Sequence, residues 1–459
     1  MEYISTRNTK KIFSFKDVFL KGLAPDGGLF VPKIFPKFSL NEIFEFKNLS
    51  YNNLAIKIII KFCGNEFNEN EVTEIVGRSY KDFRDKNVVK IKKLNEINLL
   101  ELFHGPTLAF KDIAMQIIGN MYDVILKKEN TNINLVVATS GDTGAAAINA
   151  IKNRENMKIF VLHPYNKISE VQRKFMTTVD SRNVFNIALQ GNFDECQKLV
   201  KSMFADSKFR ESIKMSGVNS INWSRIIAQI VYYFYSYCKV AKKGEKINFS
   251  VPTGNFGDIY AGYVAKKMGL PINKLIIATN NNDILKRVLD TGLYKPLKVK
   301  HTISPSMDIQ IASNFERLIF DVCSCNSDET LGLMNELSQN GEFLLKEESL
   351  KKIRESFCSA SLSEEVTKSV IKKIYKEEKI LVDPHTAIGI GAVSKMSLEG
   401  EVIALGTADP SKFSEVVKKE TGVTPKLPEN IKKILKKGEK FDKMSKDLEK
   451  IKDYILKRI

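Results

Sequence analysis

Short runs of β-branched and apolar residues alternate with longer, helically spaced segments through most of the chain. Six such runs are predicted to be strands: 134–139, 158–162, 184–189, 247–251, 275–278 and 402–405. Strands that alternate with helical segments are typical of a mixed or parallel sheet with helices on its faces. The pattern therefore predicts an α/β fold.

The two ends of the chain have a different pattern. After a turn-rich stretch at 22–32, apolar residues recur at helical spacing between Leu54 and Phe62. Residues 1–85 are therefore expected to form a mostly helical N-terminal domain, followed by regions at 86–240 and 241–459. The lysine-rich tail after Pro428 is expected to be helical and exposed, because its charges are spaced like the solvated face of an amphipathic helix.

Composition places the chain among ordinary globular proteins. Hydrophobic residues make up 43% and charged residues 27% of its 459 residues. No apolar run approaches the ~20 residues that span a bilayer. The N-terminus has no signal-like segment and the cysteines are few, so a cytoplasmic protein with reduced thiols is expected. No metal site is expected, because no further ligands follow Cys323 and Cys325 at zinc spacing.

The formal net charge of +17 raises the question of an anionic partner. Lysines are spread along the chain and usually neighbour acidic residues, and no nucleic-acid recognition motif is present. Neither a nucleic-acid partner nor a membrane partner is expected. Small anions remain compatible with the charge.

Two predicted strands run into glycine-rich loops. The first loop is Ser140-Gly-Asp-Thr-Gly144, and the second is Pro252-Thr-Gly-Asn-Phe-Gly-Asp258. Glycine permits a sharp turn, and free amide groups at a helix N-terminus favour an anion. Each loop is a candidate cradle for a carboxylate or phosphate, and each also fits an ordinary tight turn. Neither matches the dinucleotide fingerprint or the Walker pattern, which disfavours nicotinamide cofactors and P-loop nucleotide chemistry.

Lys111 stands at the expected start of a helix, followed by helically spaced apolar residues. A helix N-terminus and apolar neighbours both disfavour a protonated amine, so the pKa of Lys111 is expected to be lowered and its amine to be nucleophilic toward an aldehyde. Most lysines at helix starts are simply solvated. A Schiff-base lysine combined with two anion cradles, however, is the equipment of a pyridoxal phosphate enzyme.

Eight strings resemble those of threonine synthase, a family of fold-type II pyridoxal phosphate enzymes. They occur in family order at 22–32, 101–116, 138–147, 171–176, 219–229, 251–258, 304–318 and 383–389. The resemblance implies a fold like that of the tryptophan synthase β subunit, with two α/β domains and an N-terminal mostly helical domain. It also implies conversion of O-phospho-L-homoserine and water into L-threonine and phosphate, the last step of threonine biosynthesis, with pyridoxal 5'-phosphate as cofactor.

The resemblance assigns cofactor roles to particular residues. Lys111 is expected to bind the cofactor aldehyde, and Thr407 to be the hydroxyl partner of the pyridine nitrogen. The loop expected to contact the cofactor and hold its phosphate comprises Gly254, Asn255, Phe256, Gly257 and Asp258. The family usually has His where this chain has Asp409, which leaves the contacts around Thr407 open.

Substrate roles are assigned in the same way. The first glycine loop resembles a clamp for the substrate carboxylate, with Ser140, Asp142 and Thr143 as its residues. The substrate phosphate requires a cation, for which Arg225 and Lys174 are the candidates. The N-terminal domain is a candidate lid or frame for the site.

Two alternative functions remain open from the sequence. One is a related phospho-amino-acid lyase or dehydratase on the same scaffold, which stops after elimination. The other is a catalytically inactive basic binding protein. The sequence does not indicate the oligomeric state.

Overall fold

The computed structural model describes residues 1–459, which form two compact units. Unit 1 comprises residues 1–77, 83–104 and 220–425, and unit 2 comprises residues 78–82, 105–219 and 426–459. Most of the N-terminal region thus belongs to the same unit as residues 220–425. The division into three domains expected from the sequence stays a prediction.

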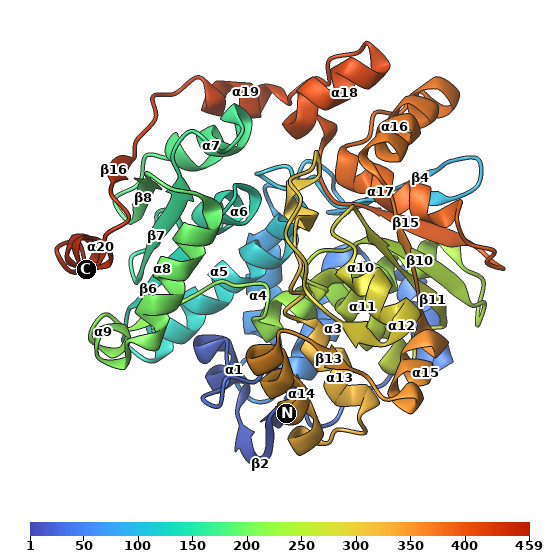
Figure 1. Ribbon diagram of the computed structural model, residues 1–459, viewed down its shortest axis with the longest axis horizontal. Coiled ribbons are helices and arrows are strands. Elements are labelled where there is room, and N and C mark those ends of the chain that lie inside the picture. The colour runs from blue at the N-terminus through green and yellow to red at the C-terminus, as the bar shows by residue number, and fades with distance from the viewer. The chain divides into compact units, whose positions relative to one another are not determined.

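Unit 1 contains a six-stranded sheet in the order β14-β11-β10-β15-β5-β4 (Figure 1). Its first five strands are parallel, and β4 joins the edge antiparallel. The strands are β14 (Phe357–Ser361), β11 (Ile272–Thr279), β10 (Ile247–Pro252), β15 (Val402–Gly406), β5 (Asn98–Glu101) and β4 (Lys90–Lys93). Parallel strands present their carboxyl ends at one edge of a sheet, so the loops that follow the neighbouring strands β10 and β15 emerge at the same edge.

Helices cover this sheet. Helix α17 packs against β10, β11 and β15, while α11 packs against β10 and β11 and is itself covered by α10. The helices named here are α10 (Trp223–Val240), α11 (Gly257–Lys267) and α17 (Pro384–Val393). Every residue of β10 is buried, as is usual for a central parallel strand with both faces covered.

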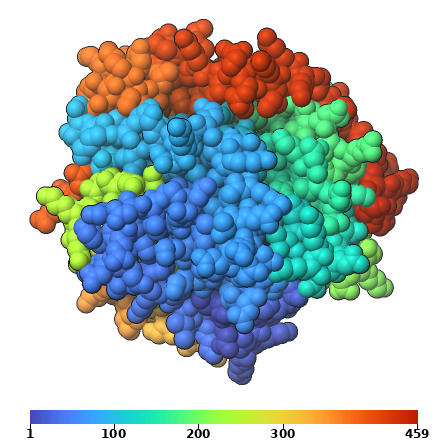
Figure 2. Space-filling view, turned by 180° about the vertical axis from the view of Figure 1, so that it is seen from behind, coloured from blue at the N-terminus to red at the C-terminus, as the bar shows by residue number.

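The N-terminal region is helical, as expected, but it also contains a three-stranded antiparallel sheet that the sequence pattern did not predict. Its elements are β1 (Tyr3–Ser5), β2 (Asn8–Phe13), β3 (Phe30–Pro32), α1 (Phe15–Lys21), α2 (Leu40–Glu45), α3 (Tyr51–Cys63) and α4 (Glu69–Tyr80). The predicted apolar face of α3, from Leu54 to Phe62, is buried and α3 packs against α10. In the space-filling view the N-terminal residues form one continuous blue area of the surface (Figure 2).

Unit 2 contains a parallel five-stranded sheet in the order β16-β8-β7-β6-β9. The strands are β16 (Asp442–Met444), β8 (Val184–Leu189), β7 (Met157–Pro164), β6 (Ile133–Ala138) and β9 (Met215–Ser216). Its principal helices are α5 (Lys111–Lys128), α6 (Asp142–Ile151), α7 (Glu170–Thr177) and α8 (Phe193–Ala205). Helix α5 packs on α6, and α8 packs on β6 and β7.

All six predicted strands are confirmed, as β6, β7, β8, β10, β11 and β15. The α/β fold class is therefore confirmed. The remaining elements are α9 (Ser207–Ser212), α12 (Ile284–Thr291), β12 (Leu293–Tyr294), α13 (Phe315–Val322), α14 (Ser327–Asn340), β13 (Phe343–Leu344), α15 (Glu347–Ser356), α16 (Glu364–Glu378), α18 (Ser414–Thr421) and three short 3₁₀ helices. None of the helices combines the length and the apolar character that crossing a bilayer requires.

The C-terminal tail corrects an expectation. It forms α19 (Glu429–Leu435), strand β16 and α20 (Leu448–Leu456). Strand β16 pairs in parallel with β8, and Ile451 and Ile455 of α20 are fully buried in the hydrophobic core of unit 2. The two helices confirm the helical part of the prediction. The expected exposure was wrong and β16 was missed, because a three-residue edge strand carries no apolar signal and α20 has only a narrow apolar face among its lysines.

Candidate active site

Lys111 is the first residue of α5, as its sequence context predicted. Only 9% of the residue is exposed, and no side chain caps the N-terminus of the helix. Its Nζ lies 3.4 Å from Oδ2 of Asp142 and over the ring of Phe110 at 5.2 Å from the centroid. The amine is thus held in a largely buried position beside the predicted substrate loop.

The loop Ser140–Gly144 leads from β6 into α6, whose N-cap residue is Gly141. Asp142 is the first residue of α6, and Oδ1 of Asp142 accepts a hydrogen bond of 3.0 Å from Nε2 of Gln172. The hydroxyls of Ser140 and Thr143 make no hydrogen bond within the chain. These hydroxyls and the amide of Thr143 are therefore available to an anion. The amides of Gly141 and Gly144 instead donate to Oγ1 of Thr139, at 3.0 and 2.9 Å.

The second loop follows β10 and ends at α11, whose first turn also has no side-chain cap. Phe256 takes the left-handed conformation at φ 64°, and its ring packs at 5.2 Å from that of Phe315. A Cβ atom on Gly254 would lie 2.8 Å from the carbonyl oxygen of Ser306, so only glycine fits there. Uncapped amides at a helix N-terminus suit a phosphate group. The residues present therefore fit the phosphate of the expected cofactor.

Buried hydrogen bonds from Asn314 and Arg317 support the backbone of this loop. The carbonyl oxygen of Asn255 accepts hydrogen bonds from both the amide and the side chain of Asn314, at 3.1 and 3.0 Å. Arg317 donates to the side chain of Asn314 and to the carbonyl oxygens of Phe30 and Ile221. Because Phe30 belongs to β3, Arg317 ties the N-terminal region to the loop. These contacts favour the N-terminal domain as a fixed frame for the site rather than as a lid.

Thr407 follows β15 and is 6% exposed. Its amide donates to Oγ1 of Thr386 at 3.2 Å, whereas its hydroxyl has no partner in the chain. The hydroxyl is therefore available to a ring nitrogen, as the resemblance implies.

Asp409, which replaces the family's usual His, has partners of its own. Its Oδ2 lies 3.1 Å from Nη2 of Arg84, and its Oδ1 accepts from the amide and hydroxyl of Ser411. Arg84 also donates to the carbonyl oxygen of Phe103. The replacement is thus accommodated by a local ion pair and a capped turn, without a hydrogen bond to Thr407.

Asp258 points away from the loop toward α10. Its Oδ1 accepts from the hydroxyls of Tyr232 and Tyr233 at 2.5 and 3.0 Å, while its Oδ2 is buried without a partner. Burial raises the pKa of Asp258 to about 6. The backbone amide of Asp258, rather than its carboxylate, is the group presented at the start of α11.

The two candidate cations for the substrate phosphate differ in their surroundings. Arg225 is 4% exposed and its guanidinium makes no hydrogen bond within the chain. Burial lowers the pKa of Arg225 to about 10. Lys174 instead forms an ion pair of 2.8 Å with Glu170 on the face of α7. A buried guanidinium without an acceptor is the stronger candidate, because such a group is costly unless a ligand pairs with it.

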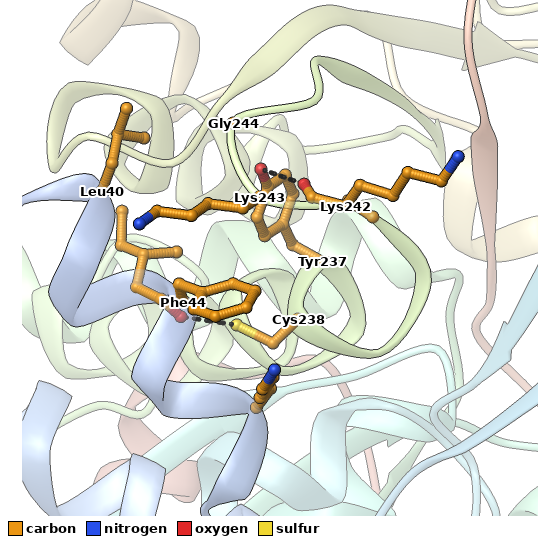
Figure 3. A pocket seen from close by; sticks show the side chains of 10 residues that line it. Leu40, Phe44, Tyr237, Cys238, Lys242, Lys243 and Gly244 are labelled. Atoms are coloured by element: carbon orange, nitrogen blue, oxygen red, sulfur yellow. Dashed lines mark hydrogen bonds between the residues drawn. The ribbon is translucent and has the colours of Figure 1, made fainter.

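A separate pocket lies between α2 and the C-terminal end of α10 (Figure 3). Leu40, Phe44, Tyr237 and Cys238 line it together with lysines, and the thiol of Cys238 donates to the carbonyl oxygen of Ile43. None of the predicted site residues lines this pocket. It is therefore unrelated to the predicted chemistry.

Comparison with known proteins decides the family. Residues 2–80 match the family described as threonine synthase N terminus, residues 88–354 the pyridoxal-phosphate dependent enzymes, and residues 386–455 the threonine synthase C-terminal family. The threonine synthase of Pseudomonas aeruginosa is 42% identical, with 99% of this chain and 98% of that protein aligned. The chain belongs to the threonine synthase family. It is similar in sequence to threonine synthase from Saccharomyces cerevisiae as well, at 40% identity over 99% of this chain and 97% of the relative.

Solved structures of threonine synthases agree. The pyridoxal phosphate-bound threonine synthase from Brucella melitensis has a TM-score of 0.97 at 42% identity, covering 100% of this chain and 99% of that chain. The threonine synthase from Escherichia coli has a TM-score of 0.84 at 30% identity, with 100% of both chains covered. The predicted family, fold type, activity and cofactor are confirmed: the chain functions as a threonine synthase that depends on pyridoxal phosphate.

Several residues that shape the site were not singled out from the sequence. Gln172, Asn314, Arg317, Asp383 and Thr386 all make buried hydrogen bonds to predicted site residues or to their immediate supports. Each lies inside one of the strings that carried the resemblance. The signal was therefore present, but residue type alone does not tell which group such a side chain binds.

Proposed function

We propose that this threonine synthase acts on O-phospho-L-homoserine and water, with Lys111 binding the cofactor aldehyde and then transferring the proton at Cα. The observation that supports this most directly is the buried Nζ of Lys111, held at an uncapped helix N-terminus beside the Ser140–Gly144 loop.

Pyridoxal phosphate, when bound, supplies an electron sink for negative charge that develops on the substrate. The amine of Lys111 then serves as a base for the Cα proton and returns a proton at the end of the reaction. Asp142, 3.4 Å from Nζ and fixed by Gln172, orients that amine. Its fixed position matters because proton transfer requires hydrogen-bond reach.

The other assigned residues bind and orient. Ser140 and Thr143 hold the substrate carboxylate through their hydroxyls and the amide of Thr143. Residues 254–258 hold the cofactor phosphate through the amides at the start of α11. The hydroxyl of Thr407 pairs with the pyridine nitrogen. Arg225 binds the substrate phosphate and stabilises its charge as it departs.

The test of Lys111 is a direct one. Wild-type protein reconstituted with pyridoxal phosphate should show an absorbance band near ~410–420 nm, and borohydride should fix the cofactor to a peptide containing Lys111. Lys111→Ala should lose both the band and turnover, whereas Lys127→Ala, exposed near the other end of the same helix, should keep both. Threonine formation well above background by Lys111→Ala would refute the assignment.

Product analysis separates the proposed reaction from its alternatives. Incubation with O-phospho-L-homoserine should release phosphate and threonine in equal amounts. Phosphate accompanied by 2-oxobutyrate would instead indicate a lyase, and no product at all would indicate an inactive binding protein.

Arg225→Ala should raise KM and lower kcat, by about ten- to a hundredfold in kcat/KM, because a charged hydrogen bond contributes roughly 1.5–3 kcal/mol. Arg225→Lys should restore part of the loss, since the charge remains. Lys174→Ala is the matched control and should change little. A large effect of Lys174→Ala with none from Arg225→Ala would reverse the assignment.

The proposal includes no nucleic-acid partner, and the cytoplasmic location expected from the sequence stays a prediction. Part of the basic charge is carried by lysines paired with acidic neighbours on helix faces, as in Lys368 with Glu364 and Lys432 with Glu429. Tight nucleic-acid binding at physiological salt would contradict this part of the proposal.

A further inference from the structure

One buried carboxylate connects two of the proposed cofactor-binding elements. Asp383 is the N-cap residue of α17 and is fully buried. It accepts hydrogen bonds from the amides of His385 and Thr386 at 2.9 and 3.0 Å. It also accepts from the side chains of both residues, with 2.6 Å between Oδ2 and Nδ1 of His385. The two amide bonds are ordinary helix capping, whereas the two side-chain bonds are additional.

The first arm leads to Thr407. The hydroxyl of Thr386 donates to Asp383 and accepts the amide of Thr407 at 3.2 Å. Because its proton is committed to the carboxylate, the hydroxyl presents a lone pair to the amide. Asp383 thereby fixes the backbone of the residue whose hydroxyl is proposed to bind the pyridine nitrogen.

The second arm leads to the phosphate loop. With Nδ1 bonded to Asp383, Nε2 of His385 accepts the amide of Ser306 at 3.2 Å. The carbonyl oxygen of Ser306 lies 2.8 Å from the position that a Cβ on Gly254 would occupy. The backbone of Ser306 therefore packs directly against the loop at Gly254.

A second carboxylate, that of Asp308, does not compete with Asp383 for the hydrogen bonds of His385. The charge of Asp308 interacts with His385, but its oxygens accept hydrogen bonds from Thr302 and Asn280. The ring of His385 packs at 5.0 Å from that of Phe413. His385 is thus fixed in its ring plane, with one nitrogen directed to each partner.

We propose that Asp383 is a positioning residue that sets both ends of the cofactor, the pyridine ring through Thr386 and the phosphate through His385. This inference rests on the proposed roles of Thr407 and of the loop at 254–258. It predicts that loss of the Thr386 hydrogen bonds and loss of the His385 hydrogen bonds have different effects on cofactor binding. Breaking the Thr386 arm should affect binding of the ring, whereas breaking the His385 arm should affect binding of the phosphate only.

The experiment compares two probes on the apoenzyme by equilibrium titration: pyridoxal 5'-phosphate and pyridoxal, which lacks the phosphate. Thr386→Val keeps the shape but removes the hydroxyl, and it should weaken both probes by about three- to tenfold, the effect of one net hydrogen bond. Thr386→Ser keeps the hydroxyl and should bind both probes like wild type. This pair isolates the hydrogen bond from the volume.

For the other arm, His385→Phe keeps a ring against Phe413 but removes both nitrogens. It should weaken pyridoxal 5'-phosphate by about three- to tenfold and leave pyridoxal within about twofold of wild type. Asp383→Asn retains an amide oxygen as acceptor but loses charge and lone pairs, and it should weaken both probes. If Asp383→Asn does not fold, the Thr386 and His385 variants carry the test, with urea unfolding of each apoenzyme as the check on folding.

Unchanged affinity for both probes in folded Thr386→Val and His385→Phe would overturn the proposal and leave Asp383 as a helix cap. Equal weakening of both probes by both variants would also overturn it, because a general loosening of unit 1 would explain that result. Thr407→Val separates this inference from the proposed function. If Thr407→Val lowers the affinity for both probes while Thr386→Val lowers neither affinity, only the inference about Asp383 fails. If Thr407→Val lowers neither affinity, the proposed role of Thr407 fails as well.

Discussion

Deletion of the C-terminal residues 442–459 tests whether the basic tail is structural. The deletion removes β16 and α20, and with them two fully buried isoleucines, Ile451 and Ile455. Burial of an isoleucine side chain contributes roughly 1.5–3 kcal/mol, so the pair accounts for about 3–6 kcal/mol before the pairing of β16 with β8 is counted. That figure is an upper estimate, because the unfolded chain already buries part of this surface.

Such a loss is large against the roughly 5–15 kcal/mol that stabilises a typical domain. The same sheet carries β6, which leads into Asp142 beside Lys111. We therefore expect the truncated protein to unfold at much lower urea concentration and to lose the absorbance band of bound cofactor in parallel. Circular dichroism during urea titration measures the first effect, and the absorbance spectrum measures the second.

Single substitutions grade the same effect. Ile455→Ala should lower the free energy of unfolding by about 2–4 kcal/mol, whereas Lys457→Ala, on the exposed side of the tail, should change it by less than about 0.5 kcal/mol. A truncated protein with an unchanged unfolding curve and unchanged threonine formation would refute the structural role and restore the exposed tail expected from the sequence.

Two further predictions concern close packing and buried charge. Gly254→Ala places Cβ against the carbonyl oxygen of Ser306 and should weaken cofactor affinity by about tenfold or more in apoenzyme titrations, whereas Gly332→Ala, with open space around it in α14, should raise the free energy of unfolding by about 1 kcal/mol. His163 is buried, and burial lowers its pKa to about 4. The unfolded chain binds its proton below about pH 6.5 and the folded chain only near pH 4, so stability should fall by about 2 kcal/mol from pH 7 to 5 in urea titrations, and His163→Phe should lack this component.

The strands and the glycine loops were accessible from the sequence because each is signalled by neighbouring residues. A buried parallel strand such as β10 is a continuous apolar run, and the loop that follows must contain glycine where the backbone of Ser306 approaches. Strands with weak local signals were missed. β14 reads Phe-Cys-Ser-Ala-Ser and β16 reads Asp-Lys-Met, and only their pairing with β11 and β8 makes them strands.

The supports of the site were inaccessible for a different reason. Arg317 would be taken for a solvated charge from its residue type, yet it is fully buried and donates to groups up to 287 positions away in the chain. No local pattern specifies which carbonyl oxygen such a side chain will reach, because that depends on the complete fold. Asp383 is similar: it caps α17, but no local pattern shows that Thr386 will extend the cap to Thr407. The strings shared with the threonine synthase family therefore mark two kinds of residue, those proposed to contact the cofactor or substrate and those that fix the backbone behind them, and the second kind becomes visible only in three dimensions.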